Sequence, residues 1–180
     1  TRDWSDTLLG ATGMQRSQMP RLHEGTEVTG KLRHELATRW GMGSDVVIAG
    51  GGGDNACGAC GTGVISEGEG TVSLGTSGVL FVAMKTPRPS LEYAIETLCH
   101  SVPGTWHQMS VILSATSCLN WVAKLLKRNA AELVADLGPE LGTPSPLLFV
   151  PFLDGSWSPR SDTEIRGALI GLQHSSDEIE

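Results

Sequence analysis

Residues Val46–Gly63 read VVIAGGGGDNACGACGTG, and this stretch decides the fold of the chain. Its first residues, Val46–Ile48, are β-branched, which is typical of a fully buried strand. The four glycines Gly50–Gly53 let the backbone turn sharply and come close to a ligand. The small residues from Asn55 to Val64 predict a helix that packs tightly against a neighbour. The stretch therefore predicts a strand, a glycine turn and a helix in an α/β fold.

Asp54 lies where the glycine turn meets the predicted helix. Backbone donors and the positive end of the helix dipole both favour its ionised form there. An ionised carboxylate at the mouth of a glycine turn, beyond the carboxyl end of a strand, is well placed to act as a general base. The alternative is an ordinary N-cap residue after a tight turn. These residues alone leave both interpretations open.

Length and composition favour a folded chain and exclude several classes of protein. The 180 residues can bury a hydrophobic core, and 39% hydrophobic with 18% charged residues is typical of a soluble globular chain. A net charge of −7 argues against nucleic-acid binding, and no window is long and apolar enough for a membrane span. The opening residues, TRDWSDTLLG, lack a signal peptide and an initiator methionine, so we expect a segment of a longer protein.

The four cysteines are too few and too scattered for a disulfide framework, which favours a reducing, cytoplasmic setting. Cys57 and Cys60 form a C-x-x-C pair, which is typical of half a zinc site or of a redox pair. Because no second close pair accompanies them and their neighbours are small, we interpret both as packing residues and predict no metal site. Cys99 and His100 are adjacent potential metal ligands, but the alternation of side chains along a predicted strand explains the pair without a metal site.

Hydrophobic periodicity predicts further helices and strands along the chain. The acidic, glycine-rich run Ser66–Gly70 is the predicted boundary between two structural units. Helices are expected at 4–12, 32–40, 110–127 and 130–137, and two β-hairpins at 71–84 and 97–109. The last expected elements are strands at 147–150 and 168–172, the second of them buried, and a helix capped by Ser175 or Ser176.

A second glycine-rich turn, Gly75-Thr76-Ser77-Gly78, lies at the tip of the first predicted hairpin. Backbone N–H groups and two hydroxyls at such a tip can hold phosphate oxygens, and the alternative is a plain hairpin turn. Neither glycine turn has the spacing of a dinucleotide-binding motif or a P-loop. Phosphoryl transfer needs phosphate donors and a carboxylate near the attacking hydroxyl. The combination of this turn with Asp54, facing each other across a cleft, therefore favours phosphoryl transfer.

Four segments resemble the FGGY carbohydrate kinases, and within that family the xylulokinases. They read GGGGDNACGACGTGVI, TVSLGTSGVLFV, CHSVPGTWHQMSVILSATSCLNWVAKLL and FVPFLDG. The resemblance extends from about Trp4 to the end of the chain. It implies an actin-like, ribonuclease-H-like two-domain sugar kinase fold, of which only the end of the first domain and the start of the second are present. Residues 1–66 would belong to the sugar-binding first domain and residues 67–180 to the ATP-binding second domain.

The resemblance implies a role for each candidate site residue. Asp54 would be the general base that takes the proton from the sugar hydroxyl, and Asp54 and Asn55 would bind the sugar. ATP is the implied cosubstrate with Mg²⁺, and the turn that would bind its phosphates consists of Gly75, Thr76, Ser77 and Gly78. The Mg²⁺ ligands, the first phosphate loop and the adenosine motif are expected outside this chain.

The implied reaction is the ATP-dependent phosphorylation of D-xylulose to D-xylulose 5-phosphate by the whole protein, in the cytoplasm. The 180 residues alone are expected to be inactive. Two alternatives stay open: an FGGY kinase for another ketose or polyol, and a non-catalytic sugar- or nucleotide-binding remnant. Apolar faces that lack a partner within the chain predict self-association, such as a homodimer.

The chain departs from the family pattern at two places. Gly155-Ser156-Trp157-Ser158-Pro159 stands where Gly-Glu-Arg-Thr-Pro is usual, so the usual charged pair is missing. Trp157 is expected to cover apolar surface instead. Cys57 and Cys60 stand where alanine is usual, which agrees with a packing role for both.

Overall fold

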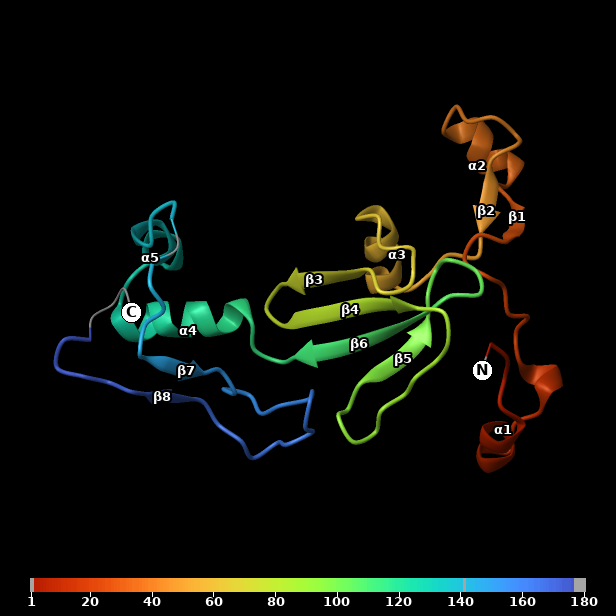
Figure 1. Cartoon of the computed structure of the whole chain (residues 1–180). Helices are drawn as coiled ribbons and strands as arrows, with labels where there is room; N and C mark the ends of the chain where they lie inside the picture. The colour runs from red at the N-terminus through yellow and green to blue at the C-terminus, as the bar shows by residue number, and fades with distance from the viewer. Residues whose placement is uncertain (1, 141, 177–180) are drawn as a thin grey trace. The chain divides into compact units, whose positions relative to one another are not determined.

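The computed structural model describes residues 2–140 and 142–176. Figure 1 shows the helices and strands of the chain, coloured along the sequence. The chain divides into two compact units, each made of three segments. The first unit consists of Thr1–Glu69, Val82–Pro87 and Leu98–His107, and the second of Gly70–Phe81, Arg88–Thr97 and Gln108–Glu180. The predicted boundary between residues 66 and 67 stays a prediction.

Among its described residues, the first unit contains three short α-helices, one 3₁₀ helix and one strand pair, and local sequence signals explain α1. Its elements are α1 (Asp6–Thr12), the 3₁₀ helix η1 (Arg16–Gln18), β1 (Val28–Lys31), α2 (His34–Arg39), β2 (Val47–Ala49) and α3 (Asp54–Gly61). The Ser5 side chain accepts a hydrogen bond from the Leu8 amide at the start of α1, and Gly13 ends this helix in the left-handed conformation. The predicted helices at 4–12 and 32–40 are therefore found, slightly shortened.

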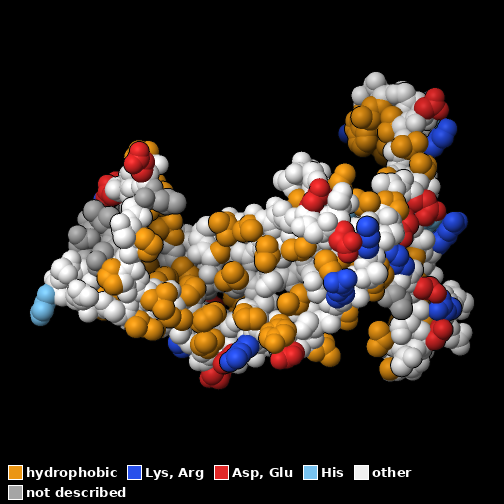
Figure 2. All heavy atoms as spheres, viewed as in Figure 1, with side chains coloured by type: hydrophobic (Ala, Val, Ile, Leu, Met, Phe, Trp, Pro, Cys, Tyr) orange, Lys and Arg blue, Asp and Glu red, His pale blue; other side chains and the backbone are white. Residues whose placement is uncertain are grey.

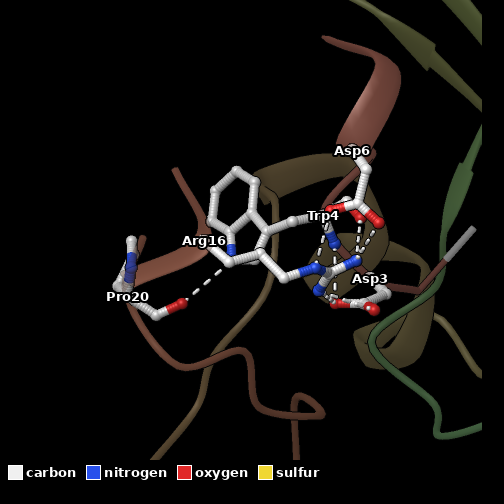
Figure 3. Close-up of polar contacts among 5 residues, drawn as sticks. All are labelled: Asp3, Trp4, Asp6, Arg16 and Pro20. Atoms are coloured by element: carbon white, nitrogen blue, oxygen red, sulfur yellow. Dashed lines mark hydrogen bonds and ion pairs between the residues drawn. The ribbon is translucent and has the colours of Figure 1, made fainter. Parts of the chain in front are cut away.

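An ion-pair cluster fixes the segment around α1 (Figure 3). The Arg16 guanidinium donates to the Asp3 carboxylate at 2.9 Å and to the Asp6 carboxylate at 2.8 Å. It also donates to the Trp4 carbonyl, while the Trp4 indole N–H donates to the Pro20 carbonyl at 2.9 Å. Arg16 lowers the pKa of the Asp3 carboxyl by hydrogen bonding. The cluster joins the start of α1 to η1.

The strand that leads into the glycine turn is present, but its predicted burial is wrong. β2 pairs only with β1, in an antiparallel two-stranded sheet in which Lys31 lies opposite Val47. Val47 is 54% exposed and Ile48 is 46% exposed. A two-stranded ribbon covers neither of its own faces, so β-branched residues on it stay accessible unless another layer packs there.

A four-stranded sheet has the strand order β3-β4-β6-β5 (Figure 1). Its strands are β3 (Gly70–Leu74), β4 (Gly78–Met84), β5 (Glu96–Cys99) and β6 (Trp106–Ile112). Both predicted hairpins are confirmed, because β3 neighbours β4 and β5 neighbours β6. β4 carries the most buried side chains of the sheet, Phe81 and Ala83.

The second unit contains α4 (Thr116–Leu126), α5 (Ala130–Asp136), β7 (Leu148–Val150) and β8 (Ala168–Ile170). The predicted helix at 110–127 starts later than expected, because β6 continues through Ile112. Residues 110–112 read SVI, and the β-branched side chains of Val111 and Ile112 suit a strand better than a helix. α5 lies where predicted, and the Asn129 side chain caps it by accepting from the Ala131 amide at 2.8 Å.

β7 and β8 form an antiparallel pair in which Phe149 lies opposite Leu169. The Phe149 ring stacks on Trp121 of α4, with ring centroids 6.2 Å apart. The predicted burial of β8 is wrong, since Ile170 is 55% exposed, for the same reason as in β2. The helix predicted after Ser175 or Ser176 lies outside the described residues.

Exposed hydrophobic side chains occur on both units, as the orange atoms in Figure 2 show. They include large residues such as Leu91, Leu74 and Leu8, which are 97%, 69% and 69% exposed. No helix in the described part of the chain is long and apolar enough to cross a membrane. The predicted homodimer stays a prediction.

Candidate active site

Asp54 is the first residue of α3 and not its cap. The N-cap is Gly53, which offers no side-chain hydrogen bond. The Asp54 carboxylate is exposed, and its Oδ1 accepts from the Asn55 backbone amide at 2.8 Å and from Asn55 Nδ2 at 3.4 Å. Its Oδ2 accepts no hydrogen bond from the described residues. The interpretation of Asp54 as an ordinary N-cap is therefore wrong, and one carboxylate oxygen is held while the other is accessible.

The glycine turn before Asp54 is held by backbone hydrogen bonds to the segment around Glu24. The Gly50 amide donates to the Glu27 carbonyl at 2.9 Å, and the Gly51 amide donates to the Gly25 carbonyl at 3.0 Å. Gly51 has a φ of +78°, in the left-handed region that favours glycine. A Cβ at Gly50 would overlap the Glu24 carbonyl oxygen. Glycine is needed here because two backbones cross in direct contact.

The turn between β5 and β6 also contacts α3, and its two key residues were not predicted as site residues. A Cβ at Gly52 would overlap Ser101 Oγ, and Ser101 Oγ lies 3.5 Å from Cys57 Sγ. The His100 ring is buried, and its Nε2 lies 3.1 Å from the Val64 carbonyl oxygen. The pair Cys99-His100 was noticed in the sequence, but it was explained by the alternation of inward and outward side chains along a strand.

A cavity of about 490 Å³ lies in the first unit beside the glycine turn. Gly51–Gly53, Ser101 and Glu24 line it, whereas Asp54 and Asn55 do not. Within it, the Arg2 guanidinium donates to the Glu24 carboxylate. The arrangement supports the turn and leaves the Asp54 carboxylate outside the cavity.

The turn Gly75–Gly78 is fixed through its carbonyl groups by the start of α4. The Thr116 hydroxyl donates to the Gly75 carbonyl at 2.7 Å, and the Ser117 hydroxyl donates to the Thr76 carbonyl at 3.1 Å. The Ala115 amide donates to the same Thr76 carbonyl at 2.9 Å. Four local hydroxyls, in Thr76, Ser77, Thr116 and Ser117, thus gather at the N-terminus of an 11-residue helix.

This geometry suits an anion. Gly75, Thr76 and Ser77 are exposed, and neither the Thr76 nor the Ser77 hydroxyl is bonded to another group in the described part of the chain. Gly78 is buried, and a Cβ there would lie 3.3 Å from the Ala115 Cβ. The Gly75 amide donates to the Ser77 carbonyl within the turn, so the donors left for an anion are the Thr76 and Ser77 amides and hydroxyls.

Thr116 and Ser117, which hold the candidate turn, were not among the predicted site residues. Hydroxyl residues immediately before a hydrophobic helical stripe are a signature of a helix N-terminus. The run Ser114-Ala115-Thr116-Ser117 fits that signature, but the predicted helix start at residue 110 concealed it.

Asp54 and Asn55 belong to the first unit, and Gly75, Thr76, Ser77 and Gly78 belong to the second. The predicted pairing of the two across a cleft stays a prediction. Among the described residues, no group of three or more His, Cys, Asp or Glu side chains could hold a metal ion. Cys57 and Cys60 carry free thiols, the first exposed and the second half-buried.

Two buried groups near the site elements have shifted pKa values. Burial, with a smaller effect of His100, lowers the pKa of His107 from 6.5 to about 4. The two imidazole rings meet edge to face at 6.1 Å. Burial, with a smaller effect of Asp154, raises the pKa of the Cys118 thiol. His107 is therefore neutral at physiological pH, and Cys118 is an unreactive thiol.

The loop that departs from the family pattern is ordered by hydroxyl groups. Asp154 accepts from the buried Ser114 hydroxyl at 3.0 Å, and the buried Ser158 hydroxyl donates to the Ala94 carbonyl at 2.8 Å. Gly155 has a φ of +84°, and a Cβ there would lie 2.9 Å from the Asp162 carbonyl oxygen. Trp157 is 44% exposed, and its expected role as a cover for apolar surface stays a prediction.

Comparison with known proteins gives matches along almost the whole chain. Residues 1–61 match the model of the N-terminal domain of the FGGY family of carbohydrate kinases, and residues 70–180 match that of the C-terminal domain. A xylulose kinase of Escherichia coli strain K12 is 44% identical over 174 residues, which are 96% of this chain and 36% of that protein. A xylulose kinase of Bacillus subtilis strain 168 is 30% identical over 95% of this chain and 35% of its own length.

Solved structures agree with these matches. A xyloylose kinase from Brucella ovis superposes with a TM-score of 0.93 at 46% identity, over 98% of this chain and 36% of that one. A Plasmodium falciparum glycerol kinase with ADP superposes with a TM-score of 0.82 at 18% identity, over 98% of this chain and 36% of that one, which shows a shared fold only. The chain thus spans about a third of the length of its relatives, and the predicted α/β fold class is confirmed.

Proposed function

This chain belongs to the FGGY family of carbohydrate kinases, and we propose that the whole protein transfers the γ-phosphoryl group of ATP to D-xylulose. The product is D-xylulose 5-phosphate, with ADP released. The predicted actin-like fold of this family is confirmed for the part that the chain spans. Relatives named xylulose kinase, at up to 44% identity, support this sugar over another ketose or polyol.

The state of the Asp54 carboxylate is the observation that carries this proposal. Asn55 holds Oδ1, and Oδ2 is left accessible at the first residue of α3. In the proposed reaction Oδ2 accepts the proton of the attacking sugar hydroxyl, whose oxygen forms the new bond to the γ-phosphorus as the bond to ADP breaks. Asn55 orients the carboxylate and, through its amide, contributes to sugar binding.

The turn Gly75–Gly78 supplies donors for the ATP phosphates in this proposal. Thr116, Ser117 and Ala115 occupy the Gly75 and Thr76 carbonyls, and the Gly75 amide occupies the Ser77 carbonyl. The donors that remain are the amides and hydroxyls of Thr76 and Ser77. Such a donor set fits phosphate oxygens. Mg²⁺ bound with ATP would neutralise phosphate charge, and we assign no Mg²⁺ ligand among the described residues.

The domain assignment and cellular setting follow the same proposal. We assign residues 1–66 to the sugar-binding domain and residues 67–180 to the ATP-binding domain. Four free thiols suit a reducing cytoplasm. The exposed apolar side chains support self-association of the protein.

The test is sugar-dependent ADP release by the whole protein, with Asp54→Asn compared with wild type. Losing a general base lowers the rate by ~10²–10⁴-fold, so kcat should fall by that order while the KM for D-xylulose changes little. Asp45→Asn is a matched control, because Asp45 is exposed and pairs only with Lys31 in the described chain.

The possible results separate the alternatives. Full activity of Asp54→Asn would mean that this residue only begins a helix. Turnover with another ketose or with a polyol, in preference to D-xylulose, would change the substrate but keep the kinase. A wild-type protein that binds sugar or ATP without releasing ADP would be a non-catalytic remnant.

A further inference from the structure

The turn after β5 contacts both ends of α3, the helix that begins with Asp54. At the start of the helix, Ser101 Oγ lies against Gly52 and 3.5 Å from Cys57 Sγ. At its end, His100 Nε2 lies 3.1 Å from the Val64 carbonyl, and His100 Nδ1 lies 3.9 Å from Cys60 Sγ. Two consecutive residues therefore hold a short helix at two points.

The hydrogen bonds of His100 define its tautomer. Its Nδ1 accepts from the Val102 backbone amide at 3.0 Å, so that nitrogen carries no proton in this arrangement. Nε2 therefore carries the proton and donates to the Val64 carbonyl. The ring is only 3% exposed, so this is a buried imidazole that joins its own turn to Val64, just after the end of α3.

The helix depends on these contacts for its direction. α3 has eight residues, and its N-cap Gly53 forms no side-chain hydrogen bond. At 1.5 Å per residue the helix is about 12 Å long, so a tilt of about 5° at one end moves the other end by about 1 Å. A displacement of that size at a reacting group costs on the order of 10²-fold in rate.

We infer that His100 and Ser101 are positioning residues for the proposed phosphoryl transfer, which act by fixing α3 and so directing the Asp54 carboxylate. The inference rests on the proposed function for its effect on rate, but not for the contacts themselves. Neither residue is assigned a contact with sugar or ATP. Their effect should therefore appear in kcat, with KM for both substrates nearly unchanged.

The experiment compares four variants of the whole protein with wild type. His100→Leu removes both hydrogen bonds of the ring, whereas His100→Gln keeps a donor near the position of Nε2. Ser101→Ala removes the contact with Cys57, and His34→Gln replaces an exposed histidine of α2 as a control. We expect kcat to fall 10–100-fold in His100→Leu and less in His100→Gln, with KM values within about threefold of wild type.

A second measurement tests the contacts without relying on activity. Amide hydrogen exchange at residues 57–63 should accelerate at least tenfold in His100→Leu and stay unchanged in His34→Gln. An active wild type with unchanged kcat in His100→Leu overturns the positioning role. Unchanged exchange overturns it as well, whether or not the wild type turns over. If the wild type releases no ADP but exchange accelerates, the proposed function fails and the fixing of α3 stands.

Discussion

Replacing Gly25 with alanine would place one methyl group where three backbone segments meet. The new Cβ would lie 2.7 Å from the Ser101 carbonyl oxygen, 3.0 Å from the Gly51 carbonyl oxygen and 3.3 Å from the Ser101 Cα. Contacts under 3.0 Å are not tolerated, so the Ser101 segment must move by at least 0.3 Å, the difference between 3.0 and 2.7 Å. All three atoms belong to the backbone, so a change of rotamer cannot relieve the overlap.

Two opposing effects determine how Gly25→Ala changes the free energy of unfolding: overpacking lowers it, and the reduced entropy of the unfolded chain raises it. Overpacking of a well-packed site costs about 1–3 kcal/mol. A glycine-to-alanine change at a permitted backbone conformation returns about 0.4–1 kcal/mol through the unfolded state. The hydrogen bond from the Gly51 amide to the Gly25 carbonyl, 3.0 Å long, is strained at the same time. We therefore expect Gly25→Ala to lower the free energy of unfolding by about 1–2 kcal/mol.

Urea unfolding followed by circular dichroism measures this cost. Gly58→Ala is the matched control, because nothing lies within 4 Å of a Cβ at this position in α3. That change should raise the free energy of unfolding by about 0.5–1 kcal/mol, since glycine is unfavourable inside a helix. If Gly25→Ala unfolds at the same urea concentration as wild type, the three-backbone contact does not exist as described.

Two further predictions concern ATP binding and pH. Thr116→Val removes the 2.7 Å hydrogen bond to the Gly75 carbonyl and should raise the KM for ATP about fivefold, which corresponds to about 1 kcal/mol. Thr116→Ser keeps the hydroxyl and should leave this KM unchanged. Equal KM values for the two variants would contradict the proposed phosphate turn. Burial and His100 lower the pKa of His107 from 6.5 to about 4. Between these two pH values His107 is protonated in the unfolded chain but not in the folded chain. Stability present above pH 6.5 should therefore be lost as the pH falls toward 4, by up to about 3 kcal/mol, and His107→Gln should flatten this slope in urea unfolding.

Local signals in the sequence were sufficient for most element positions. Ser5 and Gly13 delimit α1 because a capping hydroxyl and a left-handed glycine act within a few residues. Asn129 begins α5 in the same way. The start of α4 was missed because Val111 and Ile112 run directly into the apolar residues of the helix pattern while their backbone belongs to β6. Periodicity alone cannot separate the two when a strand runs directly into a helix.

Burial and long-range contacts were beyond the sequence. β-branched residues in β2 indicated a strand, but their exposure depends on what packs against the ribbon, which the strand itself does not encode. Asp54 was found because its neighbours along the chain are distinctive. His100 and Ser101 were not, because they meet α3 across gaps of 40 and 44 residues. A contact between residues that far apart in the chain produces no periodic pattern in the sequence.

The two cysteines of α3, Cys57 and Cys60, allow local opening of this helix to be measured by thiol alkylation. Cys57 reports on the Ser101 contact at one end, and Cys60 reports on the His100 contact at the other. Because Cys57 is exposed and Cys60 is half-buried, alkylation should modify them at different rates in the closed helix. When the helix opens locally, the two rates should converge. Site-resolved mass spectrometry of a brief alkylation pulse would thus follow the motion of the segment that carries Asp54, with no cysteine introduced by mutation.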